Sequence, residues 1–265
     1  MTAHKIFHMA SFSRSGETLL QRCLNAHPDI EVVHQIERPD TPEDLALFRH
    51  MMRRTETEIE GDHPLLAHRT LNERSVIVVK NATWVHRFPR NGFTLVRNPF
   101  ALVASASRAT PTPDQQLRQR TQELRWVRGI DPLMTPAIEN ASAPDGFLSL
   151  YNRKLLHDRR DGLPFVRYED FVASPEDYLG RIVAHLGLEW DDAVMRSHEN
   201  YPEGMVGHGS IKLWRPIHRG SVEKYKSLAP EMLSRIYGLS HEVLLQYGYE
   251  WDGETLTTKP VDGML

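Results

Sequence analysis

The stretch KIFHMASFSRSGETLL, residues 5–20, joins a short apolar run to a loop of small residues and then to a helical pattern. Residues 5–12 predict a buried strand, and apolar residues recur at helical spacing after the loop, namely Leu19, Leu20, Cys23 and Leu24. A turn that opens a helix after a strand presents unpaired backbone N–H groups and the positive end of the helix dipole. The stretch predicts an α/β fold with an anion-binding loop, although a purely structural turn would have the same pattern.

Three further apolar runs predict strands of the same sheet, at residues 75–80, 93–97 and 163–168. Each is followed by a loop or helical segment, an alternation that favours a mainly parallel sheet with helices on both faces. Ligands of such sheets collect at the carboxyl ends of the strands. The chemistry is therefore expected where these runs end.

Helices are also predicted at residues 174–187 and 230–247, the second with a break at Gly238. The stretches 40–74 and 109–150 are polar and weakly patterned. We expect them to form helical insertions or a lid over the site.

The composition limits what the chain can be. Its 265 residues and 30.5 kDa suit a single domain, 1–265, with a substantial core. A formal net charge of −3 and a pI near 6.5 argue against a broadly basic protein that coats nucleic acid or an anionic membrane, so anion binding should be local. No apolar run approaches the ~20 residues that span a bilayer, and no leader precedes the first strand, which predicts a cytoplasmic protein.

The cysteine and histidine residues give little indication of a disulfide or a metal site. Cys23 is the one cysteine, which excludes an internal disulfide and fits a buried residue in a reducing compartment. The 14 histidines include no HExxH pattern. We therefore predict no metal site.

Two loops carry the chemistry. In the first, Arg14, Ser15 and Thr18 offer a cation and two hydroxyls beside free amides, but no lysine precedes Thr18, so the GxxxxGK[ST] pattern of nucleotide kinases fails. In the second, LVRNPFALVASASR (residues 95–108), Arg97 ends a strand and Ser105 lies two helical turns along the next helix. An arginine and a serine so placed can clamp a phosphate.

Together these segments resemble sulfotransferases that use 3′-phosphoadenosine 5′-phosphosulfate (PAPS). RSGETLLQRCLNAHPDI (14–30) is similar to the 5′-phosphosulfate loop of tyrosylprotein-type and bacterial members, and LVRNPFALVASASR to the 3′-phosphate motif. VRYEDF (166–171) and RPIHRGSVEKYKSL (215–228) are similar to the family's adenine-side strand and closing segment. The resemblance implies a P-loop-type, three-layer α/β/α fold with a mainly parallel sheet. It also implies sulfuryl transfer from PAPS to a hydroxyl or amine, with 3′,5′-adenosine bisphosphate as the second product.

The resemblance assigns roles to particular residues. The 5′-phosphosulfate would be held by the first loop, Arg14, Ser15, Gly16, Glu17, Thr18 and Leu19. Arg97 and Ser105 would hold the 3′-phosphate, and Tyr168 would lie at the adenine. In the closing segment, Arg219 and Gly220 would cover the 3′-phosphate, with Lys224 near the phosphosulfate. Lys80 matches a lysine that stabilises charge on the transferred group, or is a strand-end lysine in solvent.

The chain departs from the family at the general base. Small-molecule sulfotransferases have a histidine two residues after the lysine that matches Lys80, and here that position is Ala82. In tyrosylprotein- and carbohydrate-type members the base follows the AHPD segment. His34, with a near-neutral ordinary pKa, is the first candidate there and Glu37 the second. A structural histidine at position 34 fits the same pattern.

The second departure is Glu17, which replaces a threonine of the resembled loop. It can be a first-turn acid that points at the acceptor and takes its proton, or a salt-bridge partner that orients a lysine. It can also mark a chain that binds another nucleotide.

Two alternatives to a sulfotransferase stay open: a P-loop phosphotransferase and a nucleotide-binding protein without catalysis. The acceptor is expected to be a small molecule or carbohydrate. We expect the stretches 40–74 and 109–150 to shape its pocket. Four aromatic residues are candidates either to line this pocket or to belong to the core: Trp84, His86, Trp126 and Trp214. Nothing in the sequence indicates the oligomeric state.

Overall fold

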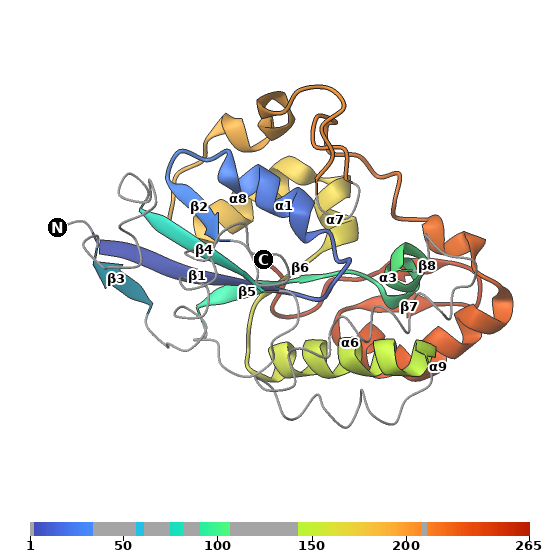
Figure 1. Ribbon diagram of the computed structural model, residues 1–265. Helices are drawn as coiled ribbons and strands as arrows, with labels where there is room; N and C mark the ends of the chain where they lie inside the picture. Colours follow the sequence, from blue (N-terminus) through green and yellow to red (C-terminus); the bar gives the residue numbers. More distant parts are fainter. Residues whose placement is uncertain (1–2, 34–56, 61–74, 82–90, 107–142, 208–210) are drawn as a thin grey trace.

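The computed structural model describes residues 3–33, 57–60, 75–81, 91–106, 143–207 and 211–265 (Figure 1). Its central sheet has the strand order β2-β4-β1-β5-β6, and neighbours along this path are parallel. The strands are β1 (Ala3–Ser11), β2 (Ile30–Val33), β4 (Val76–Asn81), β5 (Gly92–Val96) and β6 (Phe165–Arg167). The short strand β3 (Glu58–Glu60) is antiparallel to the start of β1. The predicted, mainly parallel sheet is confirmed.

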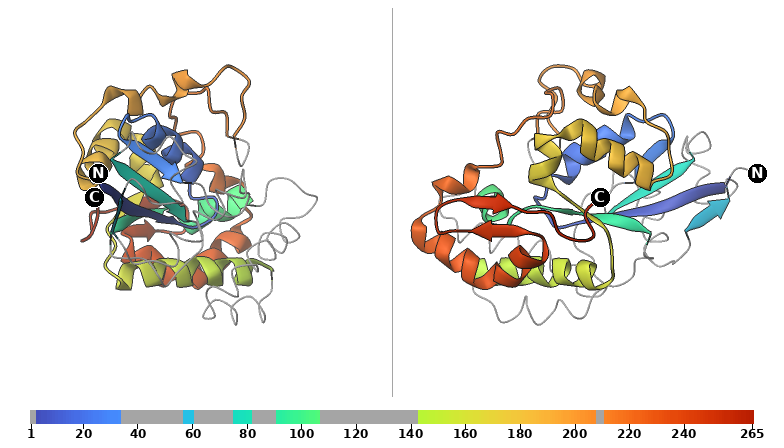
Figure 2. Two further views of the ribbon diagram at one scale, coloured as in Figure 1. Left: turned by 60° about the vertical axis from the view of Figure 1, so that its left-hand side comes forward. Right: turned by 180° about the vertical axis from the view of Figure 1, so that it is seen from behind.

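Helices cover both faces of this sheet (Figures 1 and 2). One layer contains α1 (Glu17–Asn25), α7 (Tyr168–Ala173) and α8 (Pro175–His185), and the other contains α6 (Ala143–Arg160) and α9 (Pro230–Gln246). The hydrophobic core consists of two clusters of buried residues. Alternate residues of β1 contribute side chains to one or the other, because successive side chains of a strand point to opposite faces of the sheet. Phe7 and Met9 pack in the cluster with α1, while Ile6 packs in the cluster with α6. The three-layer architecture is therefore confirmed.

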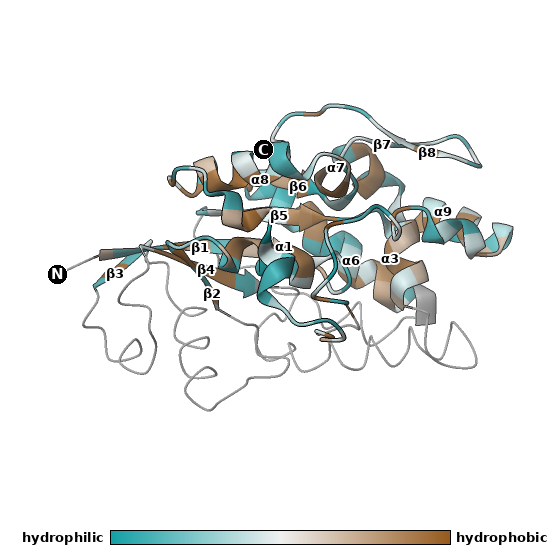
Figure 3. Cartoon of the chain, turned by 90° about the horizontal axis from the view of Figure 1, so that it is seen from above, coloured by the Kyte–Doolittle hydropathy of each residue, from teal (hydrophilic) through white to brown (hydrophobic). Residues whose placement is uncertain are grey.

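The helix α3 (Pro99–Ala106) follows β5 and is buried along most of its length. Figure 3 shows α3 as mostly apolar. A helix that is apolar all round belongs in a core. Its burial fixes the position of the loop that carries Arg97.

Several elements differ from the sequence-based expectations. The helix α9 is continuous through Gly238, because one glycine costs a helix only about 1 kcal/mol and packing supplies more. The helix α6 begins inside the stretch predicted as an insertion. A C-terminal hairpin and three 3₁₀ helices were not predicted: β7 (Tyr249–Trp251), β8 (Leu256–Thr258), η5 (Asp192–Val194), η6 (Ser197–Asn200) and η8 (Lys224–Ser227).

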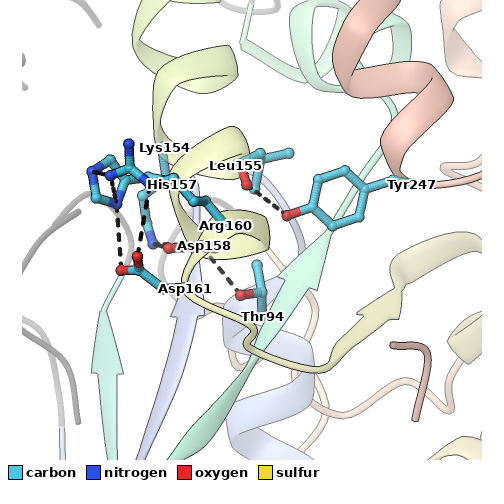
Figure 4. Close-up of polar contacts among 8 residues, drawn as sticks. All are labelled: Thr94, Lys154, Leu155, His157, Asp158, Arg160, Asp161 and Tyr247. Atoms are coloured by element: carbon cyan, nitrogen blue, oxygen red, sulfur yellow. Dashed lines mark hydrogen bonds and ion pairs between the residues drawn. The ribbon is translucent and has the colours of Figure 1, made fainter. Parts of the chain in front are cut away.

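A buried ion pair within α6 is hydrogen-bonded to the sheet (Figure 4). Lys154 Nζ lies 2.6 Å from Asp158 Oδ2, and Thr94 of β5 donates to the same oxygen at 3.2 Å. Desolvation raises the pKa of Asp158, and the charge of Lys154 opposes this shift. Near the end of the same helix, Tyr247 donates to the carbonyl oxygen of Leu155 at 2.8 Å. These contacts hold α6 against both β5 and the end of α9.

Candidate functional site

The two predicted anion-binding loops lie side by side at the carboxyl ends of β1 and β5. Arg97 Nη1 donates to the carbonyl oxygen of Arg14 at 3.0 Å, and Arg14 Nε donates to Ser105 Oγ at 3.2 Å. The residues in each contact are more than 80 positions apart in sequence. One small region of the molecule therefore holds the groups expected to bind both ends of a nucleotide.

The backbone of the first loop is strained at Arg14. Its φ of 77° makes it the only residue other than glycine with positive φ in the described ranges. Left-handed backbone is costly for such residues and concentrates at functional sites. The next turn needs a glycine, since Gly16 has φ 102° and a Cβ there would lie 2.4 Å from the ring of Tyr168.

The loop also holds a buried hydroxyl that no described group satisfies. Ser15 is 0% exposed, and its Oγ has no hydrogen-bond partner within the described part of the chain. Arg97 is 5% exposed, and its Nε is likewise unpartnered there. Buried polar atoms without partners are rare, because each forfeits its hydrogen bonds to water. Such atoms point to a ligand that would complete them.

Tyr168 joins this loop to residues 211–221. These include the start of the predicted closing segment (215–228), and from here on the name closing segment is used for residues 211–221. The guanidinium carbon of Arg97 lies 4.6 Å from the centroid of the Tyr168 ring. The phenol oxygen lies 2.7 Å from Ser221 Oγ, and Arg97 Nη2 donates to the Ser221 carbonyl oxygen at 2.8 Å. Arg97 and Tyr168 therefore hold the end of the closing segment against the first loop.

The predicted residues of the closing segment stand beside these contacts. Arg219 and Gly220 directly precede Ser221 and are exposed, and the Gly220 N–H donates to His218 Nδ1 at 3.1 Å. Lys224 opens η8 and is half-buried. The tertiary structure thus brings the chain around Ser221 to the loops of Arg14 and Arg97.

A network behind Arg97 was missed by sequence reasoning. The Asn98 side chain accepts from Ala101 N at 2.7 Å, which caps α3, and donates to Glu169 Oε1 at 2.6 Å. The other oxygen of Glu169 accepts from the Tyr249 hydroxyl at 2.7 Å. Burial raises the pKa of Glu169, opposed by the charge of Arg97. The Asn-Pro pair at the start of α3 could have indicated that Asn98 caps this helix. No local sequence pattern indicated that Tyr249 would bind Glu169.

Lys80 lies on β4 and is only 7% exposed, so its side chain does not extend into solvent. Its Nζ donates to Gln21 Oε1 at 3.3 Å. Gln21 stands one helical turn after Glu17 on α1. This contact directs the lysine toward the helix that follows the loop.

Glu17, at the first position of α1, is 8% exposed. Its Oε2 accepts from the backbone N–H of Gly16 at 3.1 Å. No lysine or arginine of the described ranges forms an ion pair with it. The carboxylate is turned back on the loop itself.

No family model matches the chain. Among curated proteins it is similar to protein-tyrosine sulfotransferase 1 of Danio rerio, with 23% identity over 252 residues, 89% of this chain and 70% of that protein. It is also similar to protein-tyrosine sulfotransferase of Drosophila melanogaster, with 22% identity over 274 residues, 89% of this chain but half of that protein.

Solved structures show the same architecture. The sulfotransferase domain from the curacin biosynthetic pathway matches with a TM-score of 0.53 and 16% identity, over 89% of this chain and 96% of that one. Mouse sulfotransferase SULT7A1 complexed with PAP matches with a TM-score of 0.52 and 13% identity, over 91% and 84%. The chain shares the fold of these two sulfotransferase structures. The P-loop-type α/β/α class and the sulfotransferase resemblance are confirmed, and these relatives support sulfuryl transfer.

Some of the predicted site residues lie outside the described residues, namely His34, Glu37, Trp84, His86 and Trp126. Their roles stay predictions. Trp214 is described and half-buried, with the guanidinium of Arg215 4.9 Å from its ring centroid.

The structure also bears on the predictions for Cys23 and for membrane-spanning segments. Cys23 is buried as expected, and desolvation raises the pKa of its thiol. None of the helices in the described ranges is both long and apolar enough to cross a bilayer.

Proposed function

We propose that this chain transfers a sulfuryl group from PAPS to the hydroxyl or amine of a small-molecule or carbohydrate acceptor, leaving 3′,5′-adenosine bisphosphate. The observation that carries the proposal is the contact of Arg97 with Arg14, which joins the two loops in one region. A ligand with phosphate groups at both ends of one nucleoside needs two such loops at close range.

The unsatisfied polar atoms fit an anionic ligand. In the proposed complex, Ser15 Oγ and the amides at the start of α1 bind the 5′-phosphosulfate, together with Arg14, Thr18 and Leu19. Arg97 and Ser105 bind the 3′-phosphate from its flank, with Arg219 and Gly220 over it and Lys224 toward the phosphosulfate. In the same proposed complex the ring of Tyr168, which lies against the guanidinium of Arg97, flanks the adenine.

The proposed reaction is an in-line displacement at sulfur. A bond forms between the acceptor oxygen or nitrogen and sulfur, while the bond from sulfur to the bridging phosphate oxygen breaks. His34, or Glu37 in second place, takes the acceptor proton. Lys80 and Arg14 stabilise the negative charge that develops on the sulfuryl and bridging oxygens.

Incubation with PAPS and a panel of hydroxyl and amine acceptors tests the activity, with sulfated product measured by mass spectrometry. Substitution Arg97→Ala should weaken 3′,5′-adenosine bisphosphate binding by about a hundredfold, because a buried, charge-assisted contact to phosphate is lost. Adenosine 5′-monophosphate, which lacks the 3′-phosphate, should bind both proteins equally. No binding of the bisphosphate would reject the proposal, and tight binding with no transfer to any acceptor would favour the non-catalytic alternative.

A further inference from the structure

Glu17 stands where the proposed ligand would bring its own negative charge. Its carboxylate accepts the N–H of Gly16, which is the N-cap residue of α1 and has no side chain to cap that helix. The side chain is 8% exposed, so the carboxylate is largely withdrawn from water. An acid therefore occupies one of the amide donors that a helix N-terminus offers to an anion.

Neighbouring basic groups do not neutralise this carboxylate through a described ion pair. Lys80 donates to Gln21, one helical turn after Glu17, instead. An independent observation shows that the loop is built for a ligand, because Ser15 Oγ is fully buried and unpartnered among the described residues. A 5′-phosphosulfate that reaches Ser15 and the Gly16 amide must compete with Glu17 for that amide.

We infer that Glu17 lowers the affinity of the chain for its nucleotide by competing with the 5′-anionic group for the Gly16 N–H. The inference rests on the proposed function of the loop as a nucleotide site. When the nucleotide binds, the carboxylate gives up its hydrogen bond and turns away, because like charges repel strongly where water is scarce. When the product leaves, the carboxylate returns to the amide and closes the anion site again.

A purely structural role makes a different prediction. A glutamate that only satisfies the free N–H at the start of a helix acts like the acid of a capping box. Its removal would lower the stability of the chain and leave nucleotide affinity unchanged. Affinity and stability therefore separate the two roles.

The test is isothermal titration of the whole chain with 3′,5′-adenosine bisphosphate, comparing wild type with Glu17→Gln and Glu17→Thr. Both variants should bind about tenfold more tightly, since a charged competitor for one amide is removed. Adenosine 3′-monophosphate, which has no 5′-phosphate, should bind all three proteins with equal affinity. Glu176→Gln is the matched control, because Glu176 is an exposed acid in the first turn of α8.

Bisphosphate affinity that is unchanged or weaker in both folded variants overturns the inference. Equal tightening for adenosine 3′-monophosphate also overturns it, since the effect would then not involve the 5′ group. If neither nucleotide binds the wild type or any variant, the proposed function fails and the inference fails with it. Thermal unfolding of each variant shows whether it is folded under the titration conditions.

Discussion

At the scale of single residues, the site depends on buried polar groups whose partners come from other elements. Glu169 is the clearest case, since its two oxygens bind Asn98 and Tyr249 and hold the backbone directly after Arg97. The hydroxyl of Tyr151 adds a bond to the Arg97 carbonyl oxygen at 2.7 Å. Arg97 is therefore held from behind while its guanidinium faces Arg14 and Ser221.

We predict that Glu169→Gln lowers the free energy of unfolding by about 1–3 kcal/mol, because one carboxylate oxygen that accepts hydrogen bonds is replaced by an NH₂ group that faces donors of Asn98 or Tyr249. Affinity for 3′,5′-adenosine bisphosphate should fall as well, since Arg97 loses its support. Urea unfolding and calorimetric titration measure the two effects. The exposed acid Glu176, changed to Gln, should alter neither quantity, and an unperturbed Glu169→Gln protein would contradict the positioning role.

At the scale of elements, α1 connects the first loop to the closing segment through Arg22. Arg22 is 3% exposed, and its Nη1 donates to the carbonyl oxygens of Leu213 and Arg215, each at 2.7 Å. Arg97 holds the other end of the closing segment at Ser221. The segment that carries Arg219 and Gly220 is thus anchored at both ends by buried arginines.

We predict that Arg22→Met releases the start of the closing segment and weakens 3′,5′-adenosine bisphosphate binding by about tenfold, the equivalent of one hydrogen bond from a charged donor. Limited proteolysis should then cut within residues 205–221 faster than in the wild type. Arg22→Lys should recover part of the affinity, because an ammonium can still reach one carbonyl. The exposed Arg196, changed to Met, is the control, and equal proteolysis rates for Arg22→Met and wild type would oppose the anchoring role.

At the scale of the whole molecule, the sheet buries ionisable groups in its centre. His8 of β1 is 1% exposed and lies in register with Val79 of β4 and Gly92 of β5. Burial, with a smaller effect of the Lys154 charge, lowers its pKa from 6.5 to about 3. Between these two values the unfolded chain binds a proton that the folded chain excludes.

The free energy of unfolding should therefore fall as the pH drops below about 6.5. By pH 5, the protonation of His8 in the unfolded chain should have lowered it by about 2 kcal/mol. Above about pH 6.5 this loss is absent. Urea unfolding at several pH values measures the slope, and His8→Asn should flatten it. His241→Gln, at an exposed position of α9, should keep the wild-type slope. Equal slopes for wild type and His8→Asn would contradict a buried, neutral His8.

Local patterns in the sequence were sufficient for the fold class and for several groups of the candidate site. The alternation of apolar runs and helical spacing predicted the parallel sheet, because burial on both faces produces those patterns directly. The spacing of Arg97 and Ser105 predicted that the two residues flank one phosphate, and in the structure both contact Arg14. The continuity of α9 and the presence of β7 and β8 were missed, because tertiary packing overrides weak local propensities.

Only the tertiary structure decided which groups meet. The contacts of Arg97 with Arg14, of Tyr168 with Ser221 and of Arg22 with Leu213 join residues 53 to 191 positions apart. No periodicity encodes such pairs, since they follow from the order of strands in the sheet and from the path of the closing segment. The direction of the Glu17 carboxylate was equally open in the sequence. It depends on which donor lies within reach of one side chain, and here that donor is the amide of its own loop.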